Sequence, residues 1–129
     1  MAHNIYDPAL DPAFQTPYID VEEQRPEGYT YVHGGFEGTD TRFSFFYPPK
    51  EQYEGRLFQF MSPVEGSENA SIGRKGMENK IGFANSHGAY FVESNMGVSA
   101  GIHQGDGSVI YKASSASAEF SRKVAERIY

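Results

Sequence analysis

The side chains best suited to chemistry are few and lie in the second half of the chain. Ser86 precedes His87, which places a hydroxyl beside an imidazole in sequence. Adjacent residues rarely face each other, so capping or turn formation is the expected role of this hydroxyl. His87, His103, Glu93 and Asp106 could supply metal ligands, but no His-x-His or Glu-x-x-His spacing supports a metal site. The sequence thus predicts neither a metal nor another cofactor.

Two further polar residues, Glu93 and Asn95, lie at the carboxyl end of an expected strand over residues 89–94. Open α/β sheets bind ligands at this edge. We therefore expect these two side chains to help position a substrate. A hydrogen bond that only stabilises the following loop is the alternative, and the sequence leaves it open.

Aromatic and β-branched runs indicate the elements that would position these residues. We expect strands over residues 29–32, 41–47, 56–61 and 89–94. The Gly-rich segment 33–40 is expected to be the turn of a hairpin between the first two strands. A short helix over residues 77–85, with Gly88 as its stop, would connect the last two strands as a parallel crossover.

The two ends of the chain have contrasting patterns. Four of the seven prolines fall within residues 1–28, which predicts an irregular Pro-rich arm before a domain over residues 29–129. The last seventeen residues predict an amphipathic helix, with one face formed by Ala113, Ala116, Phe120, Val124 and Ile128. No Gly, Asn or Pro stop follows it, and a further strand is expected next, as in the front part of a larger fold.

Composition excludes several classes of function. The chain has 129 residues, a net charge of −6 and no basic cluster, so nucleic acid and anionic membranes are not expected partners. It lacks cysteine, which excludes a disulfide or a thiol nucleophile within it. Its first residues lack a basic start and an apolar run, so cytoplasmic residence is expected. Ten Phe and nine Tyr must supply much of the core.

Several of these runs together resemble the front half of an α/β-hydrolase. They are Thr-Arg-Phe-Ser-Phe-Phe-Tyr-Pro-Pro (41–49), Gly-Arg-Leu-Phe-Gln-Phe-Met-Ser-Pro-Val (55–64), Gly-Phe-Ala-Asn-Ser-His-Gly-Ala-Tyr-Phe-Val-Glu-Ser-Asn-Met-Gly (82–97) and the Ala/Ser-rich terminal helix. In that family an antiparallel opening hairpin, a third strand, a helix, a fourth strand and a second helix precede the nucleophile elbow Gly-x-Ser-x-Gly. The resemblance covers about residues 29–129 and rests on element order.

The chain departs from that family because it contains no Gly-x-Ser-x-Gly motif. The resemblance therefore implies an N-terminal portion of a serine esterase or related acyl hydrolase, inactive alone, acting on an ester or amide. Its catalytic triad would lie on a missing C-terminal part or on a second chain.

The resemblance also places an oxyanion donor in the turn after the third strand. Pro63 has no N–H, so the donor would be the backbone N–H of Ser62 or Val64. His103, in a Gly-rich loop, would lie near the mouth of the active site and contact substrate. His33-Gly34-Gly35 copies an esterase oxyanion motif but is expected to be the hairpin turn.

A different class of function also fits the composition. An aromatic-rich β-domain that binds carbohydrate or peptide, without catalysis, would explain the Phe and Tyr content and the missing triad. It explains the long terminal helix less well. A purely structural subunit is a third alternative.

Overall fold

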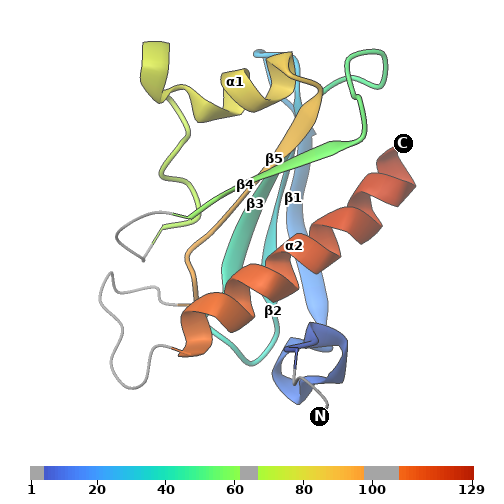
Figure 1. The fold of residues 1–129 in the computed structure, drawn as a ribbon, viewed down its shortest axis with the longest axis vertical. Helices are drawn as coiled ribbons and strands as arrows, with labels where there is room; N and C mark the ends of the chain where they lie inside the picture. Colours follow the sequence, from blue (N-terminus) through green and yellow to red (C-terminus); the bar gives the residue numbers. More distant parts are fainter. Residues whose placement is uncertain (1–4, 62–66, 98–107) are drawn as a thin grey trace.

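The computed structural model describes residues 5–61, 67–97 and 108–129. Its centre is a five-stranded sheet with the spatial order β1-β2-β3-β5-β4 (Figure 1). The strands are β1 (Pro17–Gln24), β2 (Thr30–Phe36), β3 (Arg42–Tyr47), β4 (Arg56–Phe60) and β5 (Ala89–Ser94). The pairs β1–β2, β2–β3 and β3–β5 are antiparallel, and β4 runs parallel to β5. The sheet is therefore mixed, as in α/β-type folds.

The helices alternate with the last two strands. Helix α1 (Lys80–Ser86) connects β4 to β5 and follows a single 3-10 turn, η3 (Gly76–Glu78). Helix α2 (Ser108–Ile128) follows β5, and two further 3-10 turns, η1 (Pro8–Leu10) and η2 (Pro12–Phe14), precede β1. The expected order of hairpin, strand, helix, strand and helix is present. None of the described helices has the length and apolarity that a bilayer crossing requires.

Each face of the sheet packs its own core. On one face, α2 covers Phe43, Phe45, Tyr47, Tyr90 and Val92, whose side chains are at most 2% exposed. On the other face, Phe46 and Phe91 pack against Ile81 and Ala84 of α1. The alternation of β3 and β5 residues between the two cores follows from the period of two along a strand. Because β3 and β5 are covered on both faces, their sequences are almost continuously aromatic or apolar.

The terminal helix α2 packs as its periodicity predicts. Ala113, Ala116 and Val124 are buried against the sheet, and Phe120 packs on Phe43 with ring centroids 5.5 Å apart. The Tyr47 hydroxyl donates a hydrogen bond of 2.8 Å to the Ser121 carbonyl. The apolar face of α2 is thus covered by the sheet of the same chain.

Strand β1 differs from the expectation of an irregular arm. Residues 17–24 lie within the predicted arm, yet they pair with β2 along its length. At the carboxyl end of α2, the guanidinium of Arg127 donates two hydrogen bonds, of 2.7 and 3.1 Å, to the Glu22 carboxylate. Prolines suit an edge strand because its outward N–H groups need no partner within the sheet.

The expectation that His33-Gly34-Gly35 forms the hairpin turn is wrong. All three residues lie within β2, and the turn falls at residues 37–41. A Cβ atom at Gly34 would lie 1.9 Å from the Tyr18 carbonyl oxygen, and one at Gly35 would lie 2.5 Å from the Thr41 carbonyl oxygen. The glycines therefore permit the close approach of neighbouring backbone within the sheet, a recognised role of glycine in strands.

Candidate functional site

A polar row crosses the α1 face of the sheet at the point where β5 ends. The register aligns His33 of β2 with Ser44 of β3, Ser44 with Glu93 of β5, and Glu93 with Phe60 of β4. Directly facing residues lie on the same face of a sheet. Next to this row, toward α1, lie Tyr31, Phe46 and Phe91 of the aromatic core.

Glu93 is the most unusual member of the row. Its side chain is fully buried, at 0% exposure, and its Oε2 accepts a hydrogen bond of 3.2 Å from the Ser71 backbone N–H. Its Oε1 has no hydrogen-bond partner among the described residues. Burial raises the pKa of Glu93 to about 7, against the opposing hydrogen bond from Ser71. Glu93 therefore changes its protonation state near neutral pH.

His33 bridges two carboxylates. Its Nδ1 lies 2.6 Å from Asp20 Oδ1 and its Nε2 lies 2.6 Å from Glu68 Oε2. The hydrogen bond to Glu68 raises the pKa of His33 although burial opposes the charge, and Asp20 adds to the rise. Burial disfavours the charged form of Glu68, but the hydrogen bond and charge of His33, a backbone N–H and the charge of Arg42 together outweigh it and keep the pKa of Glu68 below its usual value.

The position of Asp20 depends on a β-bulge. Ile19 pairs with Gly34 and Val21 pairs with His33, so Asp20 is the extra residue between two consecutive pairs. Bulges redirect a side chain in this way. The bulge brings the Asp20 carboxylate to the ring of His33, and no local sequence pattern indicates this contact.

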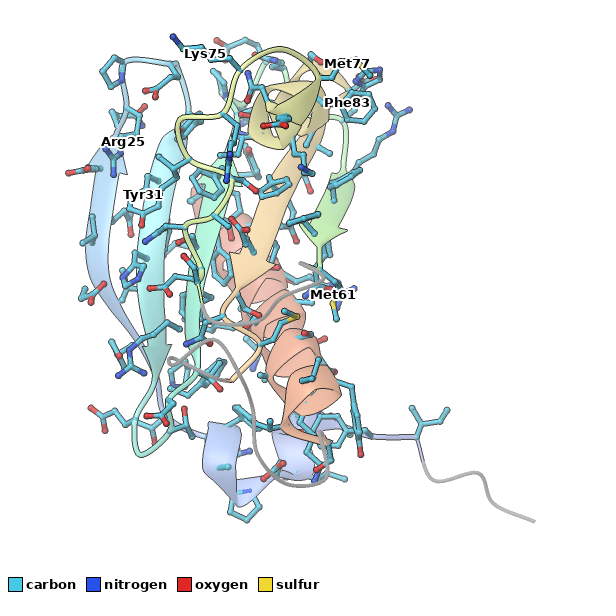
Figure 2. All side chains as sticks on the ribbon, turned by 90° about the vertical axis from the view of Figure 1, so that its left-hand side faces the viewer. Arg25, Tyr31, Met61, Lys75, Met77 and Phe83 are labelled. Atoms are coloured by element: carbon cyan, nitrogen blue, oxygen red, sulfur yellow. The ribbon has the colours of Figure 1, made fainter. Side chains whose placement is uncertain are left out.

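A second polar contact lies beside Glu68. The Asn69 side-chain oxygen accepts hydrogen bonds from the Tyr31 hydroxyl, at 2.9 Å, and from the Ser44 hydroxyl, at 2.6 Å. Glu68, Asn69 and Ser71 all belong to the segment that follows β4 and crosses this face toward α1 (Figure 2). The polar row thus holds a segment of the chain against the sheet.

The chemistry available to this cluster follows from these contacts. Both ring nitrogens of His33 are engaged by carboxylates, so neither is free to activate a hydroxyl. No group of three or more His, Asp or Glu side chains among the described residues could hold a metal ion. The cluster holds the segment around residues 68–71 against the sheet. Glu93 could act as an acid or base only if this segment moved away from it.

Of the sequence-predicted site residues, Glu93 and Asn95 lie among the described residues. Glu93 lies at the carboxyl end of β5 as expected, where β4 also ends. Asn95 follows it, and its side-chain oxygen accepts hydrogen bonds of 3.0 Å from the backbone N–H groups of Arg42 and Gly97. Its amide group donates to the Asp40 carbonyl. Asn95 therefore fastens the end of β5 to the start of β3, which is the loop-stabilising alternative. Ser62, Val64 and His103 lie outside the described residues.

Two other candidates lie away from the polar row. His87 and Ser86 are exposed at the end of α1, and both contact the Phe83 carbonyl oxygen, at 2.8 and 2.9 Å. Their own contact is 3.3 Å long. His87 precedes β5 whereas Glu93 lies at its far end, so these two residues cannot share a metal site. Asp106 lies outside the described residues.

One cavity lies next to α1, where no sequence motif indicated it. It has a volume of about 460 Å³ and opens between α1, the β1–β2 turn and residues 71–75. Its lining mixes polar and apolar residues and includes Tyr29, Arg74, Lys75, Asn79 and Ile81. Residues from four separate segments form it, which explains why no local pattern revealed it.

Comparisons with known proteins found no relationship. No family model, no curated protein and no solved structure matches this chain. The functional inference therefore depends on the fold and the residues of the chain itself.

Proposed function

We propose that this chain is the N-terminal portion of an α/β-hydrolase, a serine esterase or related acyl hydrolase. It would supply the opening strands and an oxyanion turn. The nucleophile, acid and base would lie on a separate C-terminal part, so the chain alone would be inactive. Its substrate would be a small ester or amide, and residence in the cytoplasm fits this role.

The observation that carries this proposal is the arrangement of β4, α1 and β5. The parallel pair β4–β5, connected through α1, lies beside the antiparallel strands β2 and β3, and α2 follows. The two helices pack on opposite faces of the sheet. This order agrees with the hydrolase layout that the sequence resembles.

The edge strand β4 gives a second reason for a further part. Within the described chain, β4 pairs only with β5, so its other side presents unpaired backbone groups. Phe58 is 36% exposed there, and its ring lies 6.0 Å from that of Phe83, which is 55% exposed. A further parallel strand, followed by the nucleophile elbow, would pair with this edge.

In the proposed reaction an activated serine of the C-terminal part attacks the carbonyl carbon of the substrate. The tetrahedral oxyanion would be held by a backbone N–H of Ser62 or Val64 and by one from the residue after the nucleophile. Loss of one such donor typically lowers the rate by about 10²–10³-fold. Glu93, Asn95 and His103 would help position the substrate, and Asn95 also holds the end of β5 to the start of β3.

The decisive experiment combines size, mass and labelling of active serine. The full chain, tagged and purified gently from the cells that make it, is treated with a fluorophosphonate probe. We expect a 1:1 complex in which the probe labels a second polypeptide at the serine of a Gly-x-Ser-x-Gly sequence, while this chain stays unlabelled. A lone monomer of 14.4 kDa without a labelled partner would refute the proposal.

The alternative is a non-catalytic, aromatic-rich β-domain that binds carbohydrate or peptide. Most rings are unsuited to that role because Phe43, Phe45, Phe46 and Phe91 are fully buried. The exposed pair Phe58 and Phe83 is the surface that such a domain would use. A stable monomer that binds an immobilised glycan or peptide through this pair would favour the alternative.

A further inference from the structure

Residues 67–71, which we call the strap, are held across the polar row by side chains from three strands, β2, β3 and β5. Glu68 bonds to His33 of β2, which also bonds to Asp20 of β1. Asn69 accepts hydrogen bonds from Tyr31 of β2 and Ser44 of β3. The Ser71 N–H donates to Glu93 of β5. Figure 2 shows the chain crossing this face of the sheet beside Tyr31 on its way to η3.

The contacts of the strap are almost entirely polar. Ile72, which follows the strap, packs against the aromatic core, but within the strap it is hydrogen bonds and one ion pair that bind it to the sheet. Two of these contacts, between His33 and Glu68 and between the Ser71 N–H and Glu93, involve groups whose protonation changes with pH, whereas apolar packing does not depend on protonation. The attachment of the strap should therefore respond to pH more than the attachment of the helices does.

We propose that the strap is a pH-sensitive cover, closed over the polar row at mildly acidic pH and released as the pH rises through neutrality. Release would expose the carboxyl group of Glu93 at the carboxyl ends of β4 and β5. The inference is independent of the hydrolase assignment, because it depends only on contacts within this chain.

The charged groups facing the two titrating residues determine the direction. His33 faces Asp20 and Glu68, both acidic, which favour its protonated form. Glu93 is influenced by Lys80 of α1, which favours its charge, and by Glu68, which opposes it. Burial under the strap is the larger effect on Glu93. Arg42 of β3 also favours the charged form of Glu68.

His33 and Glu93 bind more protons in the closed state than in the open state. A His whose pKa is raised in the closed state stabilises closure below its ordinary pKa, and this contribution disappears as the pH rises through the raised value. The pKa of Glu93 rises from 4.5 in the open state to about 7 in the closed state, so its contribution to closure is lost between pH 4.5 and about pH 7. Glu68, with a lowered pKa, loses its contribution only at acid pH. Closure is therefore strongest at mildly acidic pH.

Hydrogen exchange of the intact chain tests the proposal. Amide exchange in peptides spanning residues 67–73 is followed from pH 5 to pH 8 and corrected for the intrinsic pH dependence of exchange. Because each unit of pKa difference corresponds to a tenfold change, we expect the corrected opening of the strap to increase at least about tenfold. Peptides from β3 and β5 should show a much smaller change.

Variants separate the two titrating groups. Glu93→Gln keeps the acceptor for Ser71 N–H but cannot ionise. In this variant the corrected exchange rate of the strap should therefore rise less between pH 5 and pH 8 than in the unmodified chain. His33→Gln removes the ion pair with Glu68 and should raise the corrected exchange rate of the strap about tenfold or more already at pH 5. Glu119→Gln, which affects an exposed pair with Arg122 on α2 away from the strap, is the matched control and should behave like the unmodified chain.

Two results would overturn the proposal. One is a corrected exchange rate in residues 67–73 that does not change between pH 5 and pH 8. The other is a Glu93→Gln variant whose pH dependence equals that of the unmodified chain. If His33→Gln fails to fold, Glu93→Gln still decides, because it is isosteric and keeps the contact to Ser71.

Discussion

At the scale of single residues, Gly34 shows how one missing side chain permits the first edge of the sheet to form. The backbone of β1 approaches β2 so closely that a Cβ atom at Gly34 would lie 1.9 Å from the Tyr18 carbonyl oxygen. This close approach lies next to the bulge that brings Asp20 to His33. The polar cluster around His33 thus depends on the glycine that follows it in β2.

Replacing Gly34 by alanine should therefore destabilise the protein. We expect a loss of about 3 kcal/mol in the free energy of unfolding, because backbone must move to accommodate the methyl group. The measurement is denaturant unfolding followed by circular dichroism. Gly38→Ala is the control, since its Cβ would meet nothing within 4 Å and its φ of +80° costs only about 1 kcal/mol of backbone strain. Equal losses for both variants would contradict the steric explanation.

The residue scale also explains the two polar side chains at the end of β5. Glu93 points to the strap face and remains buried, with one carboxylate oxygen that has no partner among the described residues, whereas Asn95 satisfies its side-chain oxygen and amide with backbone groups. A buried polar group without a partner is costly, so its retention suggests a role beyond packing. The contacts of Asn95 are those of the loop-stabilising alternative, and its expected role in positioning a substrate stays a prediction.

At the scale of elements, the joint between β3 and α2 combines apolar packing with one buried hydrogen bond. Tyr47 is 1% exposed, packs on Tyr90 at a ring distance of 4.9 Å, and donates to the Ser121 carbonyl of α2. The hydroxyl of Ser121 in turn donates to the Ala118 carbonyl. This joint fixes the position of α2 along the strands.

Tyr47→Phe should loosen this joint without disrupting the core. The ring remains, but the Ser121 carbonyl loses a donor, and we expect the free energy of unfolding to fall by about 1–2 kcal/mol. Thermal unfolding by calorimetry measures the loss. Tyr53→Phe, which leaves the bond between β3 and α2 intact, should change stability much less. A larger loss for Tyr53→Phe than for Tyr47→Phe would show that the hydrogen bond contributes little.

At the scale of the whole molecule, the two cores have different degrees of cover. The α2 face is covered by a helix of six turns, while the α1 face is covered by a helix of two turns and the polar strap. The exposed aromatic pair Phe58 and Phe83 lies where β4 meets α1. Within the described chain, β4 is thus an edge strand with exposed aromatic side chains beside it.

If a further strand docks on β4, Phe58→Lys should weaken that assembly. The side chain is already 36% exposed, so the isolated chain should keep its fold, while the buried charge at the joined edge should lower the yield of the complex at least about tenfold. Co-purification with the labelled partner measures this. Met77→Lys is the matched control, because Met77 is exposed on η3 and lies outside β4. Retention of the complex by Phe58→Lys would exclude the β4 edge as the interface.

Local sequence determined the elements that have strong periodicity or strong punctuation. The aromatic runs over residues 41–47, 56–61 and 89–94 correspond to β3, β4 and β5, and the pattern of Ala113, Phe120 and Val124 corresponds to the buried face of α2. Gly88, with φ of +74°, ends the turn after α1 as expected. These features depend on side-chain period and backbone freedom, which are properties of neighbouring residues.

Only the tertiary structure decided the pairing of β1 with β2, the insertion of β5 between β3 and β4, and the joining of Asp20, His33 and Glu68. Pro17 and the glycines of β2 suggested an arm and a turn because their local preferences are for irregular backbone. They form strands because edge pairing needs no N–H from proline, and because a neighbouring strand can approach glycine closely. The cluster around His33 joins residues up to 48 positions apart, from Asp20 to Glu68, and long-range contacts of this kind leave no local periodicity in a sequence.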